Sequence, residues 1–469
     1  MSASALKKQG AAIDMCNGPL FGKILIFAIP IFLTGCLQLL FNTADLMVIG
    51  RFAGSRSVAA VGATSALCHL ITNLFLGVSS GVSVMVATAT GAKNDETVRR
   101  TVHTALPLSV ICGGIVNILF LLFAEPMLHI MGTPDDIIDL AALYIKIYSC
   151  GMIPTMIYNF SAGILRAVGD TRRPLMFLSL AGVINVLLNL IFVMFFKMDV
   201  AGVALATAVS QTVSAVLAVR ELMRRKDACG FHLRKVRLYG EQIKSILKIG
   251  VPAGVQSSLF SVSNVIIHSS INSFGSAAVA GNAAANNIDS FIWLSADALQ
   301  QTTLTFVGQN AGAGKPDRVK RTVKLCILST VLLVLFLGSA ANIFSETLLS
   351  LFITDSPAAI KYGKSRLLLV AGFYFMGGVM NVLSGALRSL GHSVKPMLVT
   401  LFANCIFRII WVFWVFKPLR ASEYAWEILF SAYPISFVLA SIVNLCIFMY
   451  VIKKFTRKAS SLSSLQNGI

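Results

Sequence analysis

The stretch GAKNDETVRRTV, residues 91–102, returns in modified form as GAGKPDRVKRTV at residues 312–323, an offset of 221 positions. A second pair of similar stretches, AGILRAVGDTRRP at 162–174 and SGALRSLGHSVKP at 384–396, lies 222 positions apart. Two similarities at nearly the same offset are improbable by chance. The chain of 469 residues is therefore predicted to consist of two homologous halves.

The composition is that of a membrane protein with many spans. Hydrophobic residues make up 56% of the chain and charged residues only 13%, a balance far from that of soluble proteins. Apolar runs of about 20 residues, long enough to cross a hydrocarbon core of about 30 Å, recur along the whole length. They predict an all-α membrane protein with twelve transmembrane helices. The expected spans are 20–49, 57–88, 101–123, 137–162, 174–196, 200–220, 243–271, 277–307, 322–344, 359–386, 396–416 and 424–452.

Six spans in each half predict that both halves enter the membrane from the same side, as parallel repeats typical of transporters. We expect an N-terminal six-helix lobe at 1–225, a basic cytoplasmic linker at 226–242 and a C-terminal six-helix lobe with a cytoplasmic tail at 243–469. In such proteins the substrate path lies between the halves. Pro30 and Pro252, at matching places in spans one and seven, predict a bend in each span, either a static packing kink or a hinge.

The basic residues indicate orientation in the membrane. The net charge of +19 is spread between the spans rather than collected in one polar domain, so nucleic-acid binding is not expected. Most of the 39 Lys and Arg fall in alternate segments between spans, which predicts the plasma (inner) membrane with both termini cytoplasmic. The polar N-terminus, residues 1–18, has no apolar segment of its own, so no cleavable signal peptide is expected.

Motifs for enzymatic chemistry are not found. The nine cysteines are scattered without metal-ligand spacing, and no HExxH, P-loop or paired-carboxylate arrangement is present. We therefore expect a protein that is not an enzyme, with no cofactor and no obligate protein partner beyond the lipid bilayer. Without a nucleotide site, transport would be driven by an ion gradient.

Asp45, in FNTADLMVIGRFAG at 41–54, is the first candidate functional residue. An ionised Asp at membrane depth costs about 2.5–3.5 kcal/mol, so such a residue is a functional candidate by default. The rise per residue places Asn185, Asn189 and Thr207, from spans five and six, in the same layer. This cluster could bind sodium through its oxygens, exchange a proton, or form an interhelical hydrogen-bond network with no ion.

The repeat offers an internal comparison for this cluster. At an offset of 222, Asp45 and Asn185 correspond to Ile267 and Phe407, so the second half is apolar where the first is polar. A requirement of the scaffold would be expected in both halves. The polar cluster is therefore predicted to be specific to the N-terminal half.

The second half carries its own charges near the expected midplane. Asp289 and Arg408 fall at similar depth, and either a structural pair or a substrate site is expected from them. Of the basic residues, only Arg408 and Lys146 are expected to lie deep. The candidate substrate cavity residues are Gln38, Asn42, Tyr158, Gln256, Asn264, Asp289 and Arg408.

The sequence resembles the MATE (multidrug and toxic compound extrusion) family, prokaryotic type, across nearly its whole length. The residues that carry the resemblance are Pro30 with NTADLMVIGRFAG at 42–54, NVLLNL at 185–190, GVALATAVSQ at 202–211, VGQNAGAG at 307–314, and GILRAVGDTRRP at 163–174 with its repeat. The resemblance implies a two-lobed, V-shaped antiporter that expels amphipathic, often cationic small molecules in exchange for sodium or protons.

The resemblance also implies roles for individual residues. Many prokaryotic members use an acid in span one, an Asn and an Asp four apart in span five, and a Thr in span six as the cation site. These positions fall on Asp45, Asn185, Asn189 and Thr207. Because Asn189 stands where those members often have a second acid, the resemblance favours proton over sodium coupling here, with sodium at Asp45 still open.

Two other functions are considered beside drug antiport. A flippase of a related fold, moving a lipid-linked precursor, would line its cavity with several Arg or Lys, and the sequence offers only Arg408 and Lys146 at depth. The flippase therefore ranks second. An intramembrane enzyme ranks third, because no catalytic set is found.

Overall fold

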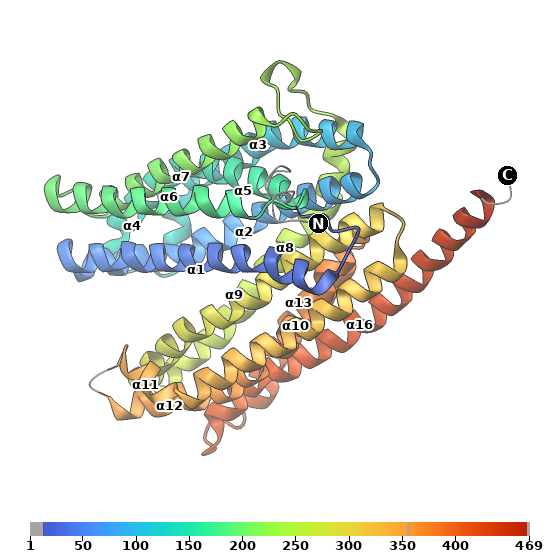
Figure 1. Ribbon diagram of the computed structural model, residues 1–469. Helices are drawn as coiled ribbons and strands as arrows, with labels where there is room; N and C mark the ends of the chain where they lie inside the picture. Colours follow the sequence, from blue (N-terminus) through green and yellow to red (C-terminus); the bar gives the residue numbers. More distant parts are fainter. Residues whose placement is uncertain (1–12, 354–355, 467–469) are drawn as a thin grey trace. The chain divides into compact units, whose positions relative to one another are not determined.

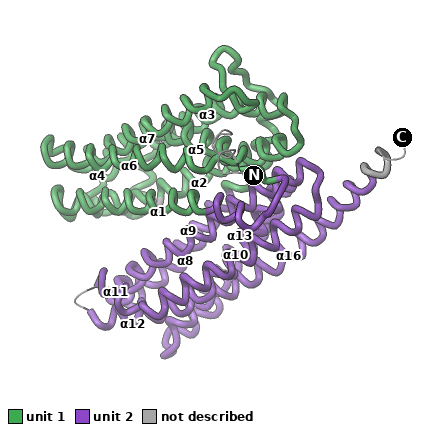
Figure 2. The backbone as a smooth tube through the Cα atoms, viewed as in Figure 1, with its two compact units in different colours: residues 1–15, 29–254 green, residues 16–28, 255–469 purple. Residues whose placement is uncertain are grey.

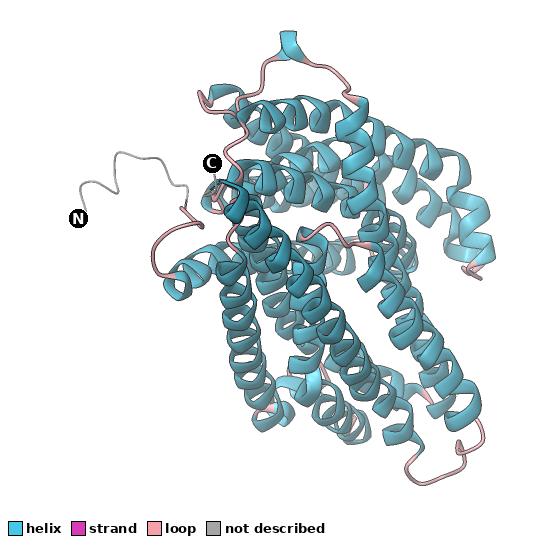
Figure 3. Cartoon of the chain, turned by 90° about the vertical axis from the view of Figure 1, so that its right-hand side faces the viewer, coloured by secondary structure: helices cyan, strands magenta, loops and turns pink. Residues whose placement is uncertain are grey.

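The chain is helical throughout the residues that the computed structural model describes, 13–353 and 356–466 (Figures 1 and 3). The first half contains α1 (Leu20–Phe52), α2 (Ser55–Gly91), α3 (Asp95–Ile130), α4 (Asp135–Cys150), α5 (Met152–Ala167), α6 (Arg172–Leu190), η1 (Ile191–Phe195) and α7 (Asp199–Arg224). The short η2 (Leu233–Lys235) follows. The second half contains α8 (Gly240–Ile271), η3 (Asn272–Phe274), α9 (Ser276–Gly312), α10 (Pro316–Ile343), α11 (Ser345–Ser350), α12 (Pro357–Val370), η4 (Ala371–Phe373), α13 (Tyr374–Ser389), α14 (Val394–Val399), η5 (Thr400–Ile406), α15 (Phe407–Ile410), η6 (Trp411–Phe416) and α16 (Ala425–Gln466).

The twelve expected spans each fall on one continuous or bent helical unit. By length and composition, ten of the described helices could cross a bilayer, and the bent pair α4 and α5 makes an eleventh. Helix α9 covers the remaining expected span. Many large apolar side chains are exposed along these helices, such as Leu122 and Val183, as expected for surfaces that face lipid.

The repeat extends to the irregular parts of the helices. Helices α4 and α5 meet at Gly151 with a bend of 47°. Gly372, 221 residues later, lies in η4, which interrupts the corresponding span between α12 and α13. The π-helical segments η1 and η6 likewise end corresponding spans. Both halves therefore share these two interruptions as well as the order of their helices.

The repeated stretch that opens the sequence marks the start of a helix in each half. The Asn94 side chain accepts a hydrogen bond of 2.9 Å from the Thr97 N–H and so caps α3, with Asp95 in the first turn. At the equivalent place α10 begins with Pro316, whose missing N–H is not needed in the first turn of a helix. Different residues thus produce the same helix boundary.

Contacts divide the described chain into two compact units (Figure 2). Unit 1 comprises residues 13–15 and 29–254, and unit 2 comprises residues 16–28 and 255–466. The division falls inside α1 and α8, within two residues of Pro30 and Pro252. The segment 226–242, expected as a linker, lies within unit 1 in this division.

The beginning of α8 packs directly against α2 inside unit 1. A Cβ added to Gly77 of α2 would lie 2.1 Å from the Gly254 nitrogen, and one added to Gly254 would lie 2.0 Å from the Leu74 carbonyl oxygen. Gly81 and Gly250 make a similar approach one turn away. Pairs of glycines four apart let two helix backbones touch, a common contact in membrane proteins. This contact explains why the start of α8 belongs to unit 1.

Unit 2 has an aromatic core near its middle. The rings of Phe260, Trp293 and Phe437 stack with centroids 5.5–6.4 Å apart. Tyr374 and Tyr433 pack at the edges of this group. Rings arranged in this way add to the stability of the core and surround one buried charge, described below.

Candidate functional site

Asp45 and the three residues predicted around it come together in unit 1. The Asn189 amide donates a hydrogen bond to Asp45 Oδ1, and the Thr207 hydroxyl is a second side-chain partner of the same carboxylate. The Asn185 amide donates to Thr207 Oγ1 at 3.3 Å, and its oxygen lies 3.4 Å from Asn189 Nδ2. Helices α1, α6 and α7 thus form one connected polar network.

A close helix contact holds the Asp45 side of α1 against α6. The Phe41 ring packs over Gly182, where an added Cβ would lie only 1.7 Å from the ring. Phe41 precedes Asp45 by one helical turn, and Gly182 precedes Asn189 by two turns, so each pair shares a helix face. The missing side chain at Gly182 therefore lets α1 approach α6 at the level of the network.

The charge of Asp45 has no internal counter-ion. Within the described residues, none of the Lys, Arg or His side chains forms an ion pair with it, and its hydrogen-bond partners are neutral. Asn189 is fully buried, yet its Oδ1 has no hydrogen-bond partner. A carboxylate beside an unused carbonyl oxygen can take up a proton or a small cation.

Two tyrosines of α4 complete the surroundings of Asp45 and were not predicted. Tyr144 and Tyr148 stack with ring centroids 5.6 Å apart, and both lie within electrostatic range of the Asp45 carboxylate. They are four residues apart and so share one face of α4. That spacing of hydroxyl-bearing rings within an apolar span was a usable signal in the sequence.

The other candidate residues of unit 1 have different environments. Asn42 is exposed on α1, three residues before Asp45, and Gln38, one turn further back, is exposed as well. Tyr158 is buried, and its hydroxyl donates a 3.0 Å hydrogen bond to the Pro174 carbonyl. Its polar group is therefore already used within α5 and α6.

Arg408 of unit 2 forms no ion pair with an acidic side chain of the described residues. It is fully buried, and its guanidinium donates to Ser436 Oγ at 3.0 Å and to Asn264 Oδ1 at 3.1 Å. The Tyr433 ring lies 4.2 Å away and the Phe437 ring 5.3 Å away, so cation–π attraction replaces part of the lost hydration. One nitrogen, Nη2, has no hydrogen-bond partner. Of the predicted cavity residues, Arg408 and Asn264 thus do meet.

Of the two alternatives for Asp289 and Arg408, the structural pair is wrong. Asp289 instead forms a buried ion pair of 2.8 Å with Arg366 of α12 and accepts a hydrogen bond of 3.3 Å from the Tyr374 hydroxyl. Counting residues from the span ends predicts the depth of Asp289 and of Arg408, but it carries no information on which helix faces meet. Arg366 lies inside the predicted span 359–386, so the rule that singled out Asp45 would also have found it.

A third charged group lies further along unit 2. The Asn381 amide donates to Asp297 Oδ1 at 3.2 Å, and Arg388 lies within electrostatic range of the same acid. Arg388 also donates a 2.8 Å hydrogen bond to Gln256, another predicted cavity residue. Both acids of α9 are thus near an arginine, unlike Asp45.

The expectation that only Arg408 and Lys146 lie deep is also wrong. Lys146 is partly exposed, 3.9 Å from the exposed Glu125. Arg366 and Arg388 are buried together with Arg408. A lysine that reaches outward along its own helix avoids burying its charge, whereas an arginine held by an acid or by rings can stay inside.

Replacing Arg366 by leucine is expected to destabilise the protein by about 3–5 kcal/mol, because the Asp289 charge is left buried without its partner. The double variant with Asp289→Leu as well should recover most of the loss, since two apolar side chains then replace two charges. Thermal unfolding of both purified variants in detergent measures the difference. Equal melting temperatures for the single and double variants would contradict this explanation.

Two repeated six-helix halves, apolar spans and charges buried within those spans define a polytopic membrane transporter. A family model described as MatE matches residues 30–191 and 252–414, so the chain belongs to the MatE family. The chain is therefore a transporter and not an enzyme.

Curated relatives and solved structures agree with this assignment. The chain is 28% identical over 386 residues to the probable multidrug resistance protein YoeA of Bacillus subtilis, covering 81% of this chain and 83% of the relative. It is 26% identical over 385 residues to the probable multidrug resistance protein NorM of Thermotoga maritima, covering 81% of this chain and 82% of the relative. An outward-facing multidrug resistance MATE transporter has the same fold, with a TM-score of 0.88 at 22% identity over 96% of this chain and 99% of that one.

Proposed function

We propose that the protein is a proton-coupled antiporter that exports amphipathic, often cationic compounds across the plasma membrane by alternating access. The relatives named as multidrug resistance proteins support this substrate class. Asp45 is the coupling residue, with Asn185, Asn189 and Thr207 as its partners. The positive-inside distribution of Lys and Arg supports an orientation with both termini in the cytoplasm.

The observation that carries the proposal is the contrast between Asp45 and the two acids of α9. Asp289 forms an ion pair with Arg366, so its charge is balanced from within the protein, and Asp297 has Arg388 within electrostatic range. Among the described residues, the hydrogen-bond partners of Asp45 are neutral side chains. A half-buried carboxylate at membrane depth without an internal cation is stable when an external cation balances it, and a proton is the smallest one. Its charge can therefore change during a transport cycle.

Protonation of Asp45 would reverse a hydrogen bond in the network. The carboxylate accepts from the Asn189 amide, whereas the protonated acid has a donor to place. A half-turn of the Asn189 amide brings its unused Oδ1 towards that donor. Loading and unloading of the proton would thus rearrange the contact between α1 and α6. Pro30 in α1 provides a place where the helix can bend in response.

The donors around Asp45 favour a proton over sodium. Asn189 and Thr207 both point hydrogens at the carboxylate, and a sodium ion would require both to turn their oxygens instead. The network also contains a single acid. A proton needs one carboxylate and one acceptor, and both are present.

A flippase of a lipid-linked precursor is the second candidate function. Three buried arginines in unit 2 favour it more than the sequence did. Arg366 and Arg388 lie beside acids, however, so Arg408 alone remains to hold a phosphate group. For substrate contacts in an antiporter we propose Gln38, Asn42, Tyr158, Gln256, Asn264, Asp289 and Arg408.

Purified protein in liposomes tests the proposal, with a fluorescent cationic dye outside and one ion gradient at a time. An acidic interior is expected to drive dye accumulation, because outward proton flow is exchanged for inward dye flow. A sodium gradient at equal pH on both sides should produce no dye accumulation. Uptake with sodium alone would overturn the proton assignment, and dye exchange that neither gradient drives would overturn antiport.

A further inference from the structure

A basic pocket of about 280 Å³ lies in unit 1, away from Asp45. Arg99, Arg100 and His103 line it from the first turns of α3, and Arg234, Lys235 and Arg237 line it from the segment before α8. Because α3 and α8 both begin here, the pocket lies at the ends of membrane-spanning helices. Such a position is the level of the lipid headgroups.

The pocket carries a surplus of positive charge. Arg100 pairs with Glu96 at 2.7 Å. The other four cations, Arg99, Arg234, Lys235 and Arg237, form no ion pair with an acidic side chain in the described part of the chain. Uncompensated cations around a cavity attract an anion with several acceptor oxygens.

The segment 231–239 is held in place on α3. The His232 N–H donates to His103 Nε2 at 3.2 Å, and the Tyr239 N–H donates to Thr104 Oγ1 at 3.3 Å. The guanidinium groups of Arg100 and Arg237 both lie near the Tyr239 ring, 5.5 and 5.6 Å from its centroid. The backbone that carries Arg234, Lys235 and Arg237 is therefore held on α3 by hydrogen bonds at both of its ends.

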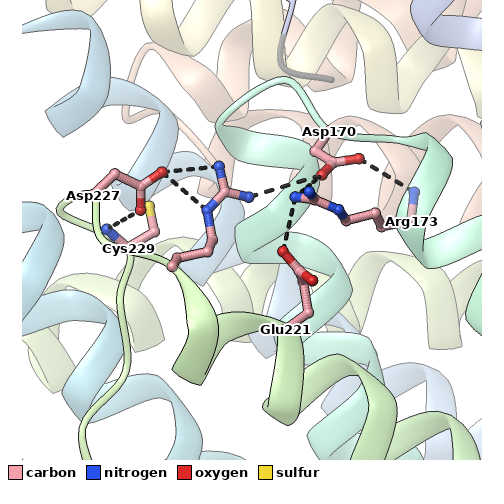
Figure 4. Close-up of polar contacts among 6 residues, drawn as sticks. Asp170, Arg173, Glu221, Asp227 and Cys229 are labelled. Atoms are coloured by element: carbon pink, nitrogen blue, oxygen red, sulfur yellow. Dashed lines mark hydrogen bonds and ion pairs between the residues drawn. The ribbon is translucent and has the colours of Figure 1, made fainter. Parts of the chain in front are cut away.

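An ion-pair network also fixes the chain just before this segment (Figure 4). Arg225, at the end of α7, contacts Asp227 at 2.9 Å and Asp170 at 3.8 Å. Arg173 bridges Asp170 and Glu221 at 3.0 and 2.8 Å. These ion pairs connect the turn at Asp170 to the end of α7. They therefore fix the direction in which the chain continues from α7 towards the segment 231–239.

Apolar side chains alternate with the cations of the pocket. Leu233 is 66% exposed, and Val236 and Leu238 are also exposed. In water such side chains would be unfavourable, but beside basic residues at the end of a span they are the pattern of a segment that touches a lipid surface. A free phosphate compound would use the cations and leave these three side chains without a partner.

We propose that this pocket binds the phosphate headgroup of an anionic phospholipid in the cytoplasmic leaflet. The cations contact the phosphate oxygens, while Leu233, Val236 and Leu238 contact the upper part of the acyl chains. The proposal rests on the cytoplasmic orientation of this segment and is independent of the coupling role of Asp45. A basic recess at the cytoplasmic end of membrane helices suits such a headgroup.

The repeat supplies a matched control. Lys320, Arg321 and Lys324 occupy the positions in α10 that correspond to Arg99, Arg100 and His103. Lys320 pairs with Asp317 at 3.1 Å. After the second half the chain continues as helix α16 to Gln466, so the described residues contain no second copy of the segment 231–239. The second half thus has similar charges without the pocket.

The test compares the triple variant Arg99→Gln, Arg234→Gln, Lys235→Gln with the control Lys320→Gln, Arg321→Gln, Lys324→Gln. Each full-length protein is purified in detergent and titrated with phosphatidylglycerol, phosphatidylcholine or inorganic phosphate, and the rise in melting temperature gives the apparent affinity. Phosphatidylglycerol is expected to stabilise the wild-type and control proteins. The pocket variant should bind it at least roughly tenfold more weakly, since each basic side chain near an anionic surface contributes about fivefold.

Other outcomes decide against the proposal. Equal stabilisation by inorganic phosphate would assign the pocket to a free phosphate compound, and equal stabilisation by phosphatidylcholine would remove the role of headgroup charge. An equal loss in both triple variants would show only a general effect of net charge. The melting temperature without lipid separates a loss of binding from a loss of folding, and single substitutions serve if the triple variant does not fold.

Discussion

Asp45→Asn is expected to reduce gradient-driven dye uptake to the rate of protein-free liposomes. The amide has nearly the shape of the carboxyl and can keep a hydrogen bond to Asn189, so the fold should survive. It cannot take up or release a proton near neutral pH, however, so the step that couples the two fluxes is lost. The measurement compares dye uptake driven by an acidic interior with dye exchange in the absence of a gradient. Loss of the first alone shows that coupling is lost while dye transport remains.

Two further variants control this experiment. Glu125→Gln, at an exposed acid of the same unit, should transport normally. Asp45→Glu keeps a carboxyl group one methylene further out and is expected to retain partial coupling. Full gradient-driven uptake in the Asp45→Asn protein would refute the proposed coupling role. Loss of both uptake and folding would be recognised from the melting temperature.

Gly254→Leu is expected to prevent stable folding, with a loss of more than about 4 kcal/mol. Even the Cβ of an alanine at this position would lie 2.0 Å from the Leu74 carbonyl oxygen, a backbone atom that cannot move aside without displacing α2. The larger leucine side chain would force α8 away from α2. Fluorescence-detected size exclusion and thermal unfolding of a tagged protein measure the effect.

Gly62→Ala, on the helix α2 that Gly254 contacts, is the control for that prediction. A Cβ at Gly62 meets nothing within 4 Å, and alanine favours a helix over glycine by about 1 kcal/mol. This variant should fold as well as the wild type or better. A Gly254→Leu protein with wild-type yield and melting temperature would show that the contact between α2 and α8 is not needed for folding.

The helices were predictable from the sequence because the bilayer imposes a length and an apolar composition on each span. All twelve expected spans fall on helical units. Local hydropathy carries no information on packing, however. The bend at Gly151 and the assignment of residues 240–254 to unit 1 depend on close backbone contacts, such as that between Gly77 and Gly254, which average apolarity does not reveal.

The two candidate clusters show where depth is sufficient as a guide. Around Asp45 the rise per residue placed Asn189 and Thr207 correctly, because all three face the interior of one six-helix group. In unit 2 the same measure suggested a partner for Asp289 at equal depth, yet Arg366 from another helix takes that place. Depth gives one coordinate of a side chain, and the rotation of its helix gives the other.

The exchange of leading segments between the units has a consequence for the history of the chain. Residues 16–28 belong to unit 2 and residues 240–254 to unit 1, so a cut within 226–242 yields two fragments, neither of which contains a whole unit. A half-length ancestor would have had the same difficulty alone. Two copies could form complete units by exchanging the first parts of their first helices, as in domain-swapped dimers. Fusion of the two gene copies would then have kept this exchange within one polypeptide.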